Sequence, residues 1–328
     1  MPETKPCSPE RTPSRRSTMQ RIQYHQYGGP SVMRLESYRL PTPGNCEVMV
    51  RVKAASINPL DWKLRQGFMK IMMGRHFPRA MGSDFSGVVE AIGPGVVGLV
   101  IGDEVLGTTP MKAPGAFAES LITTSNLLIK KPTSLSFPDA AALPSIGVTA
   151  WRALIDAGKL KAGQTVFING AAGGVGQAAI WIAKAFGAVI TVRVGPSWLA
   201  DAEKLRLARV LDYSRPIPDN LKGGFDVVFD CHGSLTAKEE DFLTKRSGVA
   251  VDIDPTFGNL VRSLISSRHS FVRGVPSSTI LQKIVDLAIA GRFPITIGRT
   301  ARLPEAVALI SDLESGKRVP GKAVIVMG

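Results

Sequence analysis

A glycine-rich turn is the first stretch of this sequence with residue types suited to ligand chemistry. Residues 170–176, GAAGGVG, hold four glycines in seven positions, between an apolar run and a segment with helical spacing. Glycine lets the backbone adopt positive φ and lets a ligand approach the main chain without meeting a β-carbon. The free N–H groups and the dipole of the following helix favour an anion such as a pyrophosphate. The turn therefore predicts a dinucleotide site, although a tight connection without a ligand also needs such glycines.

A strand and a helix have to flank this turn. Residues 165–168, TVFI, are β-branched and aromatic, the composition of a strand buried on both faces. After the turn, apolar residues recur at helical spacing as far as Gly187, a typical left-handed C′ residue. These residues are Val175, Ala179, Ile182, Ala183 and Phe186. The stretch predicts a strand, a tight turn and a helix.

The residue at the end of the next predicted strand indicates whether the site prefers NADH or NADPH. A dinucleotide fold that selects NAD carries an acidic residue there, about 20 residues beyond the glycines, which holds the ribose hydroxyls. Residues 188–193, AVITVR, end instead in Arg193. A guanidinium binds a 2′-phosphate that a carboxylate would repel. Arg193 therefore favours NADPH over NADH, unless it is only a solvated residue at a strand end.

Length, composition and charge set wider limits. The chain has 328 residues, 44% hydrophobic and 20% charged, as in a globular protein of two domains. No run approaches the roughly 18 apolar residues of a membrane span. Cys7, Cys46 and Cys231 lack paired spacing, so we expect a reducing, cytoplasmic compartment. The net charge of +13 is spread along the chain, which predicts salt-sensitive contact with polyanions and no specific nucleic-acid binding.

The sequence divides into segments of different composition. Residues 1–18 are rich in Pro, Ser, Thr and Arg and predict a disordered tail. From about residue 20 to 145, short alternating runs between glycines and prolines predict a compact β domain. Strand-like and helical runs then alternate to about residue 275, which predicts a doubly wound parallel sheet. Residues 279–328 add two helices and a closing strand, and the fold class is α/β.

Seven motifs between residues 20 and 328 together resemble the zinc-independent quinone oxidoreductase branch of the medium-chain dehydrogenase/reductase superfamily. They are SINPLDWKLRQG at 56–67, GSDFSGVVEAIGPGV at 82–96, GDEVLG at 102–107, GAFAE at 115–119, ALPSIGVTAW at 142–151, AAGGVG at 171–176 and LDY at 211–213. The resemblance implies a GroES-like β-barrel domain of residues 19–144 and 277–328. It also implies a Rossmann domain of residues 145–276, with the cofactor between the two. Ala171 replaces the first glycine of GxGxxG, as in the AAxGVG form of this branch.

No metal ion is expected. A catalytic zinc needs three side-chain ligands from Cys, His, Asp or Glu, and a structural zinc usually needs four. The three cysteines and four histidines of the chain lack such spacing. By the resemblance, Asn58 stands where zinc-dependent relatives have a cysteine ligand, and Ser83-Asp84 stands where they have a histidine–glutamate pair.

The resemblance implies three catalytic candidates. Asn58 is expected at the nicotinamide end of the cleft, where its amide would donate to a substrate carbonyl or to the nicotinamide ribose. Asp61 is a candidate at the same place, and capping of the helix that follows Asn58 explains it equally well. Lys322 matches a lysine near the cofactor in relatives, and the alternative is that it only begins an edge strand.

The cofactor contacts follow from the turn and from the resemblance. Residues 172–175 are expected to contact the pyrophosphate through their backbone, and the resemblance adds contacts to the adenosine phosphate, the ribose and the carboxamide. The candidates are Ala172, Gly173, Gly174 and Val175 for the pyrophosphate, Arg193 and Tyr213 for the adenosine phosphate, Cys231 and His232 for the ribose, and Gly274 and Val275 for the carboxamide. The strand that carries Gly274 and Val275 often pairs across a dimer axis in relatives, so a homodimer is expected.

These expectations combine into one function and two alternatives. Without a metal, hydride from NADPH suits an acceptor that is already electrophilic, a quinone or an α,β-unsaturated carbonyl. The first alternative is a zinc-free alcohol or carbonyl oxidoreductase that uses NADP. The second is a non-catalytic protein that binds NADPH or nucleic acid.

Overall fold

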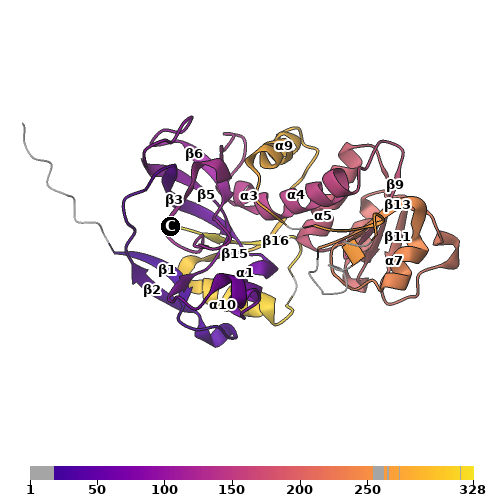
Figure 1. The fold of residues 1–328 in the computed structure, drawn as a ribbon, viewed down its shortest axis with the longest axis horizontal. Coiled ribbons are helices and arrows are strands. Elements are labelled where there is room, and N and C mark those ends of the chain that lie inside the picture. The colour runs from indigo at the N-terminus through magenta and orange to yellow at the C-terminus, as the bar shows by residue number, and fades with distance from the viewer. Residues whose placement is uncertain (1–17, 254–261, 264–265, 273, 318) are drawn as a thin grey trace, which may run out of the picture.

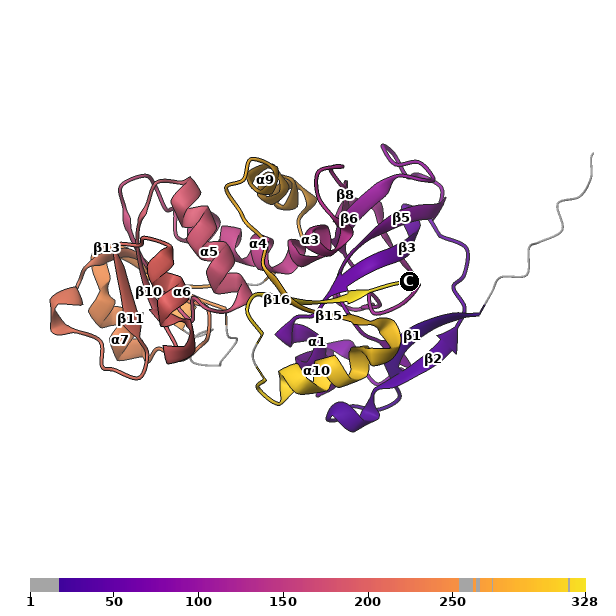
Figure 2. The same ribbon diagram turned by 180° about the vertical axis from the view of Figure 1, so that it is seen from behind.

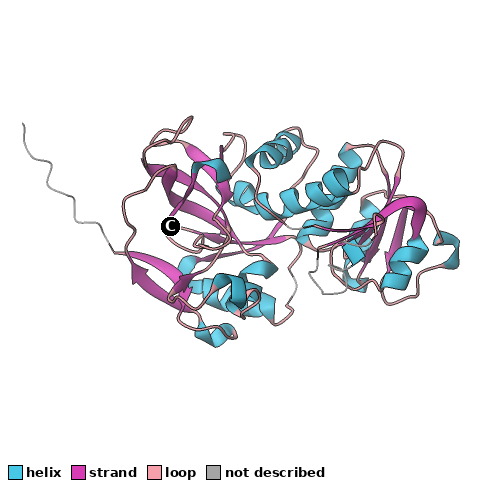
Figure 3. Cartoon of the chain, in the orientation of Figure 1, coloured by secondary structure: helices cyan, strands magenta, loops and turns pink. Residues whose placement is uncertain are grey.

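The computed structural model describes residues 18–328 except 254–261, 264–265, 273 and 318 (Figure 1). The segment 1–17, most of the expected disordered tail, lies outside these residues. Two units lie side by side along the longest axis, one around each of the two large sheets (Figure 3). No helix in the described ranges combines the length and the apolar composition that crossing a membrane requires.

The first large sheet is parallel and six-stranded. Its strands are β9 (Thr165–Asn169), β10 (Val189–Val194), β11 (Arg209–Asp212), β12 (Phe225–Asp230), β13 (Thr244–Asp252) and β14 (His269–Phe271). They are arranged in the order β11-β10-β9-β12-β13-β14, and every adjacent pair is parallel. This is the strand order of a dinucleotide-binding Rossmann fold, with the switch point between β9 and β12. The expected doubly wound sheet is confirmed.

Helices cover this sheet and pack in two apolar clusters. They are α4 (Pro144–Trp151) with the π-helical η3 (Arg152–Ala157), α5 (Gly174–Ala185), α6 (Leu199–Lys204), α7 (Ala237–Leu243) and α9 (Ser278–Ile289), with short 3₁₀ turns η4 (Pro196–Trp198) and η5 (Asp219–Leu221). Ile280, Ile284 and Val285 of α9 are buried in the same core as Val166 and Ile168 of β9. Helix α9 contacts α4 of this unit and β8 (Leu128–Lys130) of the second large sheet, so the domain boundary expected at residues 276–277 stays a prediction.

The second large sheet joins segments from both parts of the chain. Its order is β15-β16-β3-β5-β6-β8, and β7 pairs with β3. Figure 2 shows the yellow strand β16 lying against the indigo and purple strands of the first hundred residues. The strands are β3 (Glu47–Ser56), β5 (Asp84–Ile92), β6 (Glu104–Thr108), β7 (Ser120–Thr124), β8 (Leu128–Lys130), β15 (Ile297–Arg302) and β16 (Lys322–Val326).

Smaller elements close this unit. A three-stranded sheet, β2-β1-β4, lies beside it, and α1 and α10 are neighbours below the sheet in Figure 1. Buried Arg65 of α1 forms an ion pair with Glu314 of α10. The elements are β1 (Met19–Tyr24), β2 (Arg34–Tyr38), β4 (Arg79–Ala80), α1 (Pro59–Arg65), α2 (Lys70–Met73), α3 (Phe137–Ala142), α10 (Ala306–Glu314), η1 (Pro30–Val32), η2 (Ser125–Leu127) and η6 (Leu303–Glu305).

Candidate active site

The glycine turn has the geometry of an anion site at the end of β9. Gly173 is the N-cap of α5, no side chain caps the helix, and its first turn has no acidic residue. The first backbone N–H groups of a helix have no partner within the helix, so here they remain available to a ligand. A β-carbon added to Gly173 would find no heavy atom closer than the Gly170 carbonyl oxygen at 3.5 Å. The open backbone and the free donors fit the pyrophosphate of a dinucleotide.

Two other glycines of the turn are needed for its packing. A β-carbon on Gly176 would lie 2.5 Å from Cα of Ala171, which the helix approaches closely. Gly170 has φ of +77°, and a β-carbon there would lie 2.8 Å from Cβ of His232. The glycines therefore have two separate uses, since Gly173 leaves room for a ligand and Gly170 and Gly176 allow close packing.

The carboxyl end of β12 lies beside this turn. Oδ1 of Asp230 accepts hydrogen bonds from the backbone N–H groups of His232 and Gly233, both at 2.9 Å, and from Nδ2 of Asn169 at 2.8 Å. The backbone of Cys231 donates to the Asn169 carbonyl at 3.0 Å. Cys231 and His232 thus border the switch point, as expected for contacts to the ribose. Desolvation raises the pKa of the Cys231 thiol well above its usual value, so the thiol stays protonated.

Arg193 lies next to Tyr213, at the outer side of β10. Nη2 of Arg193 donates to the carbonyls of Tyr213 at 3.1 Å and Arg215 at 3.3 Å, and Nη1 lies 4.0 Å from Oε1 of Glu239. The Tyr213 side chain is 48% exposed. The two residues expected at the adenosine phosphate are therefore together. Nη2 of Arg193 already donates to two backbone carbonyls, so only part of the guanidinium is free to bind a ligand.

Asn58 and Lys322 meet in a buried polar network. Nζ of Lys322 donates to Oδ1 of Asn58 at 2.6 Å and to the Ile57 carbonyl at 2.9 Å. Nδ2 of Asn58 donates to Oδ2 of Asp84 at 2.9 Å. Asp84 in turn accepts from the backbone and the hydroxyl of Ser145, at 3.1 and 2.6 Å. The network runs from β16 through α1 and β5 to the first turn of α4, and therefore joins the two units.

The Asn58 amide is therefore oriented differently from the sequence expectation. The resemblance implied that it donates to a substrate carbonyl or to the nicotinamide ribose. In this structure Nδ2 donates to Asp84 and, at 3.5 Å, to the Ser56 carbonyl, and Oδ1 accepts from Lys322. Asn58 is only 6% exposed, because α1 begins immediately after it and covers it. The polar hydrogens available to a ligand here belong to Lys322, whose contacts to Asn58 and Ile57 use two of its three N–H bonds.

Asp61 borders the same network and caps its helix. Oδ2 of Asp61 accepts the Asn58 backbone N–H at 2.7 Å, and Oδ1 accepts the Ser83 hydroxyl at 3.2 Å. Burial raises the pKa of Asp61 to about 7, and the negative charge of Asp84 adds to the rise. Burial lowers the pKa of Lys322, although Asp84 and Asp61 oppose that change. The capping interpretation of Asp61 fits this geometry, and its carboxyl group acts on Lys322 through charge.

Lys322 also contacts the glycine turn. A β-carbon on Gly174 would lie 3.2 Å from Cδ of Lys322 and 3.1 Å from Cγ2 of Ile146. Lys322, Gly174 and Ile146 line one cavity, together with Gln177, Trp181 and residues 293–296. The fold therefore places the aliphatic part of the Lys322 side chain against the N-terminus of α5, where the cofactor is expected, and its ammonium group at Asn58.

Gly274 and Val275 lie beyond β14, and not on it. Both were expected on this strand, but β14 ends at Phe271 and both residues are exposed in the following segment. Gly274 lines a second pocket with Ser145, Val148 and Ser277. The Val275 carbonyl accepts from Nε of Arg152 at 3.1 Å. Because Gly274 lines this pocket, the expected carboxamide contact fits Gly274 better than Val275.

Comparisons with known proteins identify the family of this chain. Residues 44–133 match the family "Alcohol dehydrogenase GroES-like domain". The chain is 32% identical over 247 residues to a chloroplastic quinone-oxidoreductase homolog of Spinacia oleracea, covering 72% of this chain and 75% of that protein. The chain belongs to the quinone oxidoreductase branch of the medium-chain dehydrogenase/reductase superfamily. It is an oxidoreductase.

Two further comparisons extend over most of this oxidoreductase. The mitochondrial NAD(P)H oxidoreductase RTN4IP1 of Mus musculus is 33% identical over 322 residues, covering 85% of this chain and 81% of that protein. The structure of the quinone oxidoreductase from Coxiella burnetii superposes with a TM-score of 0.85 at 29% identity, covering 94% of this chain and 99% of that one. The GroES-like unit, the Rossmann unit and dependence on NAD(P)H are features of this family.

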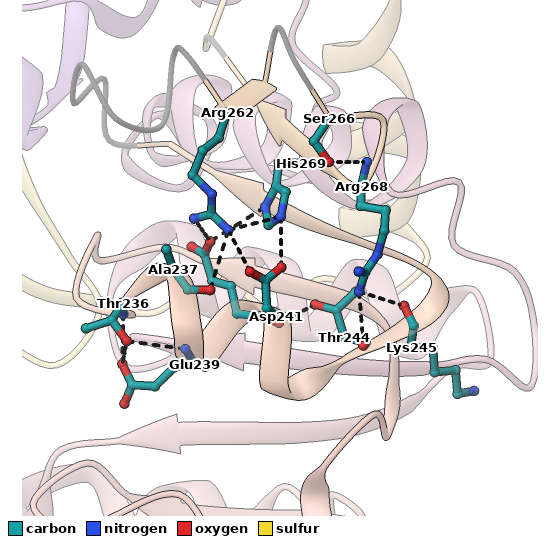
Figure 4. Close-up of polar contacts among 11 residues, drawn as sticks. Thr236, Ala237, Glu239, Asp241, Thr244, Lys245, Arg262, Ser266, Arg268 and His269 are labelled. Carbon is teal, nitrogen blue, oxygen red and sulfur yellow. Dashed lines mark hydrogen bonds and ion pairs between the residues drawn. The ribbon is translucent and has the colours of Figure 1, made fainter.

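A second charged cluster of the oxidoreductase lies at the far edge of the parallel sheet (Figure 4). Nη1 of Arg262 binds Oε2 of Glu240 at 2.5 Å, and Nε2 of His269 lies 3.1 Å from Oδ1 of Asp241. Asp230, Glu240 and Asp252 bring carboxylate oxygens within 4.8 Å of one another. Burial, and then Glu240, raise the pKa of Asp252 to about 8. The cluster ties α7 to the segment before β14.

Sequence reasoning missed three members of the network in this oxidoreductase. Asp84 and Ser83 were noted only as replacements for zinc ligands, and Ser145 was not considered. Asp84 has a signal in hindsight, because it is a carboxylate at the first position of a strand, DFSGVVEAI, in which the next five residues are apolar or small. A fully buried carboxylate needs several donors, which Asn58 and Ser145 supply.

Proposed function

We propose that this oxidoreductase reduces a quinone or an α,β-unsaturated carbonyl compound with NADPH and without zinc. The observation that carries the proposal is the position of Lys322, which bonds to Asn58 and contacts the glycine turn at Gly174. The relatives from Spinacia oleracea and Coxiella burnetii, named a quinone-oxidoreductase homolog and a quinone oxidoreductase, support the acceptor class.

A nicotinamide bound in the cleft supplies a hydride to the electrophilic atom of the acceptor. The acceptor then carries an additional electron pair, and its oxygen needs a hydrogen-bond donor and a proton. Lys322 has the position and the chemistry for this role, since its ammonium group retains one N–H beyond those bonded to Ile57 and Asn58. Burial lowers the pKa of Lys322, which makes the ammonium a stronger acid. Asn58 and Asp84 hold the side chain in place.

Zinc-free chemistry follows from the residues that replace a zinc site. Asn58 and Ser83 supply neither thiolate nor imidazole, and Asp84 is the one carboxylate of the three. Both Asp84 oxygens already accept hydrogen bonds from Ser145, and Oδ2 also accepts from Asn58. This donor set fits a hydrogen-bonded carboxylate and not a metal centre.

The preference for NADPH is part of the proposal. Residues 193–198, RVGPSW, span the end of β10 and contain no carboxylate, and Nη2 of Arg193 donates to the Arg215 carbonyl there. A 2′-phosphate placed there would meet the Arg193 guanidinium, and would need to compete with the carbonyls that Arg193 now binds and with Glu239, whose Oε1 lies 4.0 Å from Nη1. The family relationship itself supports NAD(P)H and does not distinguish the two nucleotides.

Assembly and compartment are further proposals. β14 is an edge strand whose only partner in the described sheet is β13, so its free edge can pair across a dimer axis. Light scattering after size exclusion tests the expected homodimer. The expected cytoplasmic location rests on the three scattered cysteines, whereas the names of the relatives include chloroplastic and mitochondrial proteins. Fractionation of the native cell tests it.

One titration tests the central proposal. The purified chain is titrated with NADPH and with NADH by nucleotide fluorescence, and 9,10-phenanthrenequinone or a short alkenal is then added. We expect tighter binding of NADPH, and its oxidation only after an acceptor is present. If NADPH binds but no quinone or enone oxidises it, the non-catalytic alternative is favoured. If only simple ketones oxidise the bound NADPH, the carbonyl reductase is favoured.

A further inference from the structure

A row of polar residues crosses the seven-stranded sheet. In the strand register, Ser56 of β3 lies opposite Asp84 of β5, and Asp84 lies opposite Thr108 of β6. Side chains directly opposite in neighbouring strands lie on the same face, with Cβ atoms about 4.5–5.5 Å apart. Ser56, Asp84 and Thr108 therefore form one line on the face that carries the Lys322 network.

Thr108 is the member of this row that lacks a partner. The Ser56 hydroxyl lies 3.5 Å from Oδ2 of Asp84, and Asp84 binds Asn58 and Ser145. Oγ1 of Thr108 is buried and has no hydrogen-bond partner among the residues the structure describes. A buried hydroxyl without a hydrogen-bond partner costs free energy, so this position favours a bound group that forms a hydrogen bond with it.

Thr108 lines a pocket between the two units, and the rest of the pocket is largely apolar. Helix α4 borders both this pocket and the glycine turn, because Ser145 lines the pocket and the next residue, Ile146, lies against Gly174. The Ser145 hydroxyl already donates to Oδ1 of Asp84 at 2.6 Å, so its hydrogen is used. The other lining residues are Leu127, Pro144, Val148, Gly274, Pro276, Ser277 and Leu281.

We propose that the Thr108 hydroxyl binds the carbonyl oxygen of the acceptor and makes Thr108 a specificity-determining residue. The inference rests on the proposed function, since it names the part of the acceptor that this side chain recognises. A hydroxyl donates one hydrogen to a carbonyl oxygen, and the bond strengthens as that oxygen gains negative charge during reduction. The apolar lining suits the carbon skeleton next to the carbonyl.

Matched variants separate this role from a structural one. Thr108→Val removes the hydroxyl and keeps the shape of the side chain, while Thr108→Ser keeps the hydroxyl. Thr109→Val is the control, because the Thr109 hydroxyl is also buried but bonds to the Gly82 carbonyl at 3.3 Å. Each protein is measured in three ways: Kd for cyclohex-2-enone by saturation-transfer NMR without nucleotide, Kd for NADPH by fluorescence, and kcat/KM for cyclohex-2-enone with NADPH.

The expected result is specific to the acceptor. Thr108→Val raises the enone Kd and lowers kcat/KM by about 3- to 10-fold, the effect of one neutral hydrogen bond. Thr108→Ser and Thr109→Val stay near the wild type, and the NADPH Kd is unchanged in all of them. If the wild type binds the enone but reduces no quinone or enone, the proposed function fails while the binding measurement still decides the role of Thr108.

Three results would overturn the inference. The first is an unchanged enone Kd in Thr108→Val, which means that the hydroxyl binds only an ordered water. The second is a raised NADPH Kd with an unchanged enone Kd, which assigns the hydroxyl to the cofactor. The third is the absence of enone binding to the wild type, which shows that this pocket does not receive such an acceptor.

Discussion

Nζ of Lys322 lies 2.6 Å from Oδ1 of Asn58, although the two residues are 264 positions apart in the chain. The contact exists because β16 pairs antiparallel with β3, which brings Val324 opposite Ser56. Asn58 follows β3 directly, and Lys322 opens β16. A single strand pairing therefore assembles the proposed proton donor and the residue that positions it.

Replacing Lys322 tests its chemical role. We expect Lys322→Met to lower kcat by about 10²-fold, the lower range for loss of a general acid, with the NADPH Kd within threefold of the wild type. Lys317→Met is the control, because Lys317 is exposed and forms an ion pair with Asp312. Stopped-flow measurement of NADPH oxidation checks the rate. Equal rates for Lys322→Met and wild type would remove Lys322 from the mechanism.

Replacing Asp84 tests the charge that acts on Lys322. The negative charge of Asp84 raises the pKa of Lys322 against the effect of burial, so Asp84→Asn lowers that pKa further. A general acid must be protonated, and activity is lost as the pH rises through its pKa. The alkaline fall of kcat in Asp84→Asn is therefore expected at lower pH than in the wild type. Asp286→Asn, which changes an exposed carboxylate, should leave the profile of kcat against pH in place.

The two uses of glycine in the turn can be separated by substitution. Gly173→Ala meets no atom within 3.4 Å, so we expect the melting temperature to be preserved and the NADPH Kd to rise roughly tenfold, equivalent to about 1.4 kcal/mol. Gly176→Ala places Cβ 2.5 Å from Cα of Ala171, and we expect it to destabilise the fold by about 1–3 kcal/mol. Denaturant unfolding and nucleotide titration of both variants check this. Normal NADPH affinity in Gly173→Ala would argue against a ligand on this backbone.

Arg193 tests the nucleotide preference. We expect Arg193→Ala to raise the NADPH Kd about tenfold and to leave the NADH Kd nearly unchanged, because only NADPH carries the 2′-phosphate. Fluorescence titration with both nucleotides measures the ratio, and Arg299→Ala, at an exposed ion pair with Asp312, is the control. A lower melting temperature with no change in the ratio would instead assign Arg193 to its bonds with the Tyr213 and Arg215 carbonyls.

The carboxylate cluster around Asp252 predicts how stability depends on pH. The pKa of Asp252 is raised from 3.8 to about 8, so between these values the folded chain binds a proton that the unfolded chain releases. The stability that depends on this proton is complete below about pH 4 and is lost as the pH rises toward 8. We expect the melting temperature to fall from pH 5 to pH 8, and to fall less in Asp252→Asn. Asp201→Asn, at an exposed residue, should follow the wild type.

Local patterns predicted the Rossmann unit well. The β-branched run, the glycines and the helical spacing at 165–187 correspond to β9, the turn and α5, and Gly187 has the left-handed φ of +71°. These features depend on residues close in sequence. In contrast, β15 was not predicted, because Ile297–Arg302 reads IGRTAR and lacks a strand-like apolar pattern. Its parallel pairing with β16 stabilises it, and such a partner is not visible in a local window.

The sequence predicted which residues form the site, but not which hydrogen bonds join them. Asn58, Asp61 and Lys322 were identified from motifs, and the structure brings all three together. The direction of the Asn58 amide depends on Asp84, and the position of Asp84 depends on Ser145 from the other unit. Hydrogen-bond partners across units follow from the packing of whole elements. For the same reason no sequence pattern pointed to Thr108.

The pairing of β16 with β3 also sets the order in which the two large sheets form during synthesis of the chain. The parallel sheet, its turn and the helices α4 and α9 of its core lie within residues 144–289, a continuous stretch that leaves the ribosome before β15 and β16. The other sheet cannot close until residues 322–326 emerge, and until then β3 lacks its partner at residues 54–56. The nascent chain therefore acquires its glycine turn long before it acquires Lys322. We therefore expect an immature chain to have the proposed pyrophosphate site before it has the proposed proton donor.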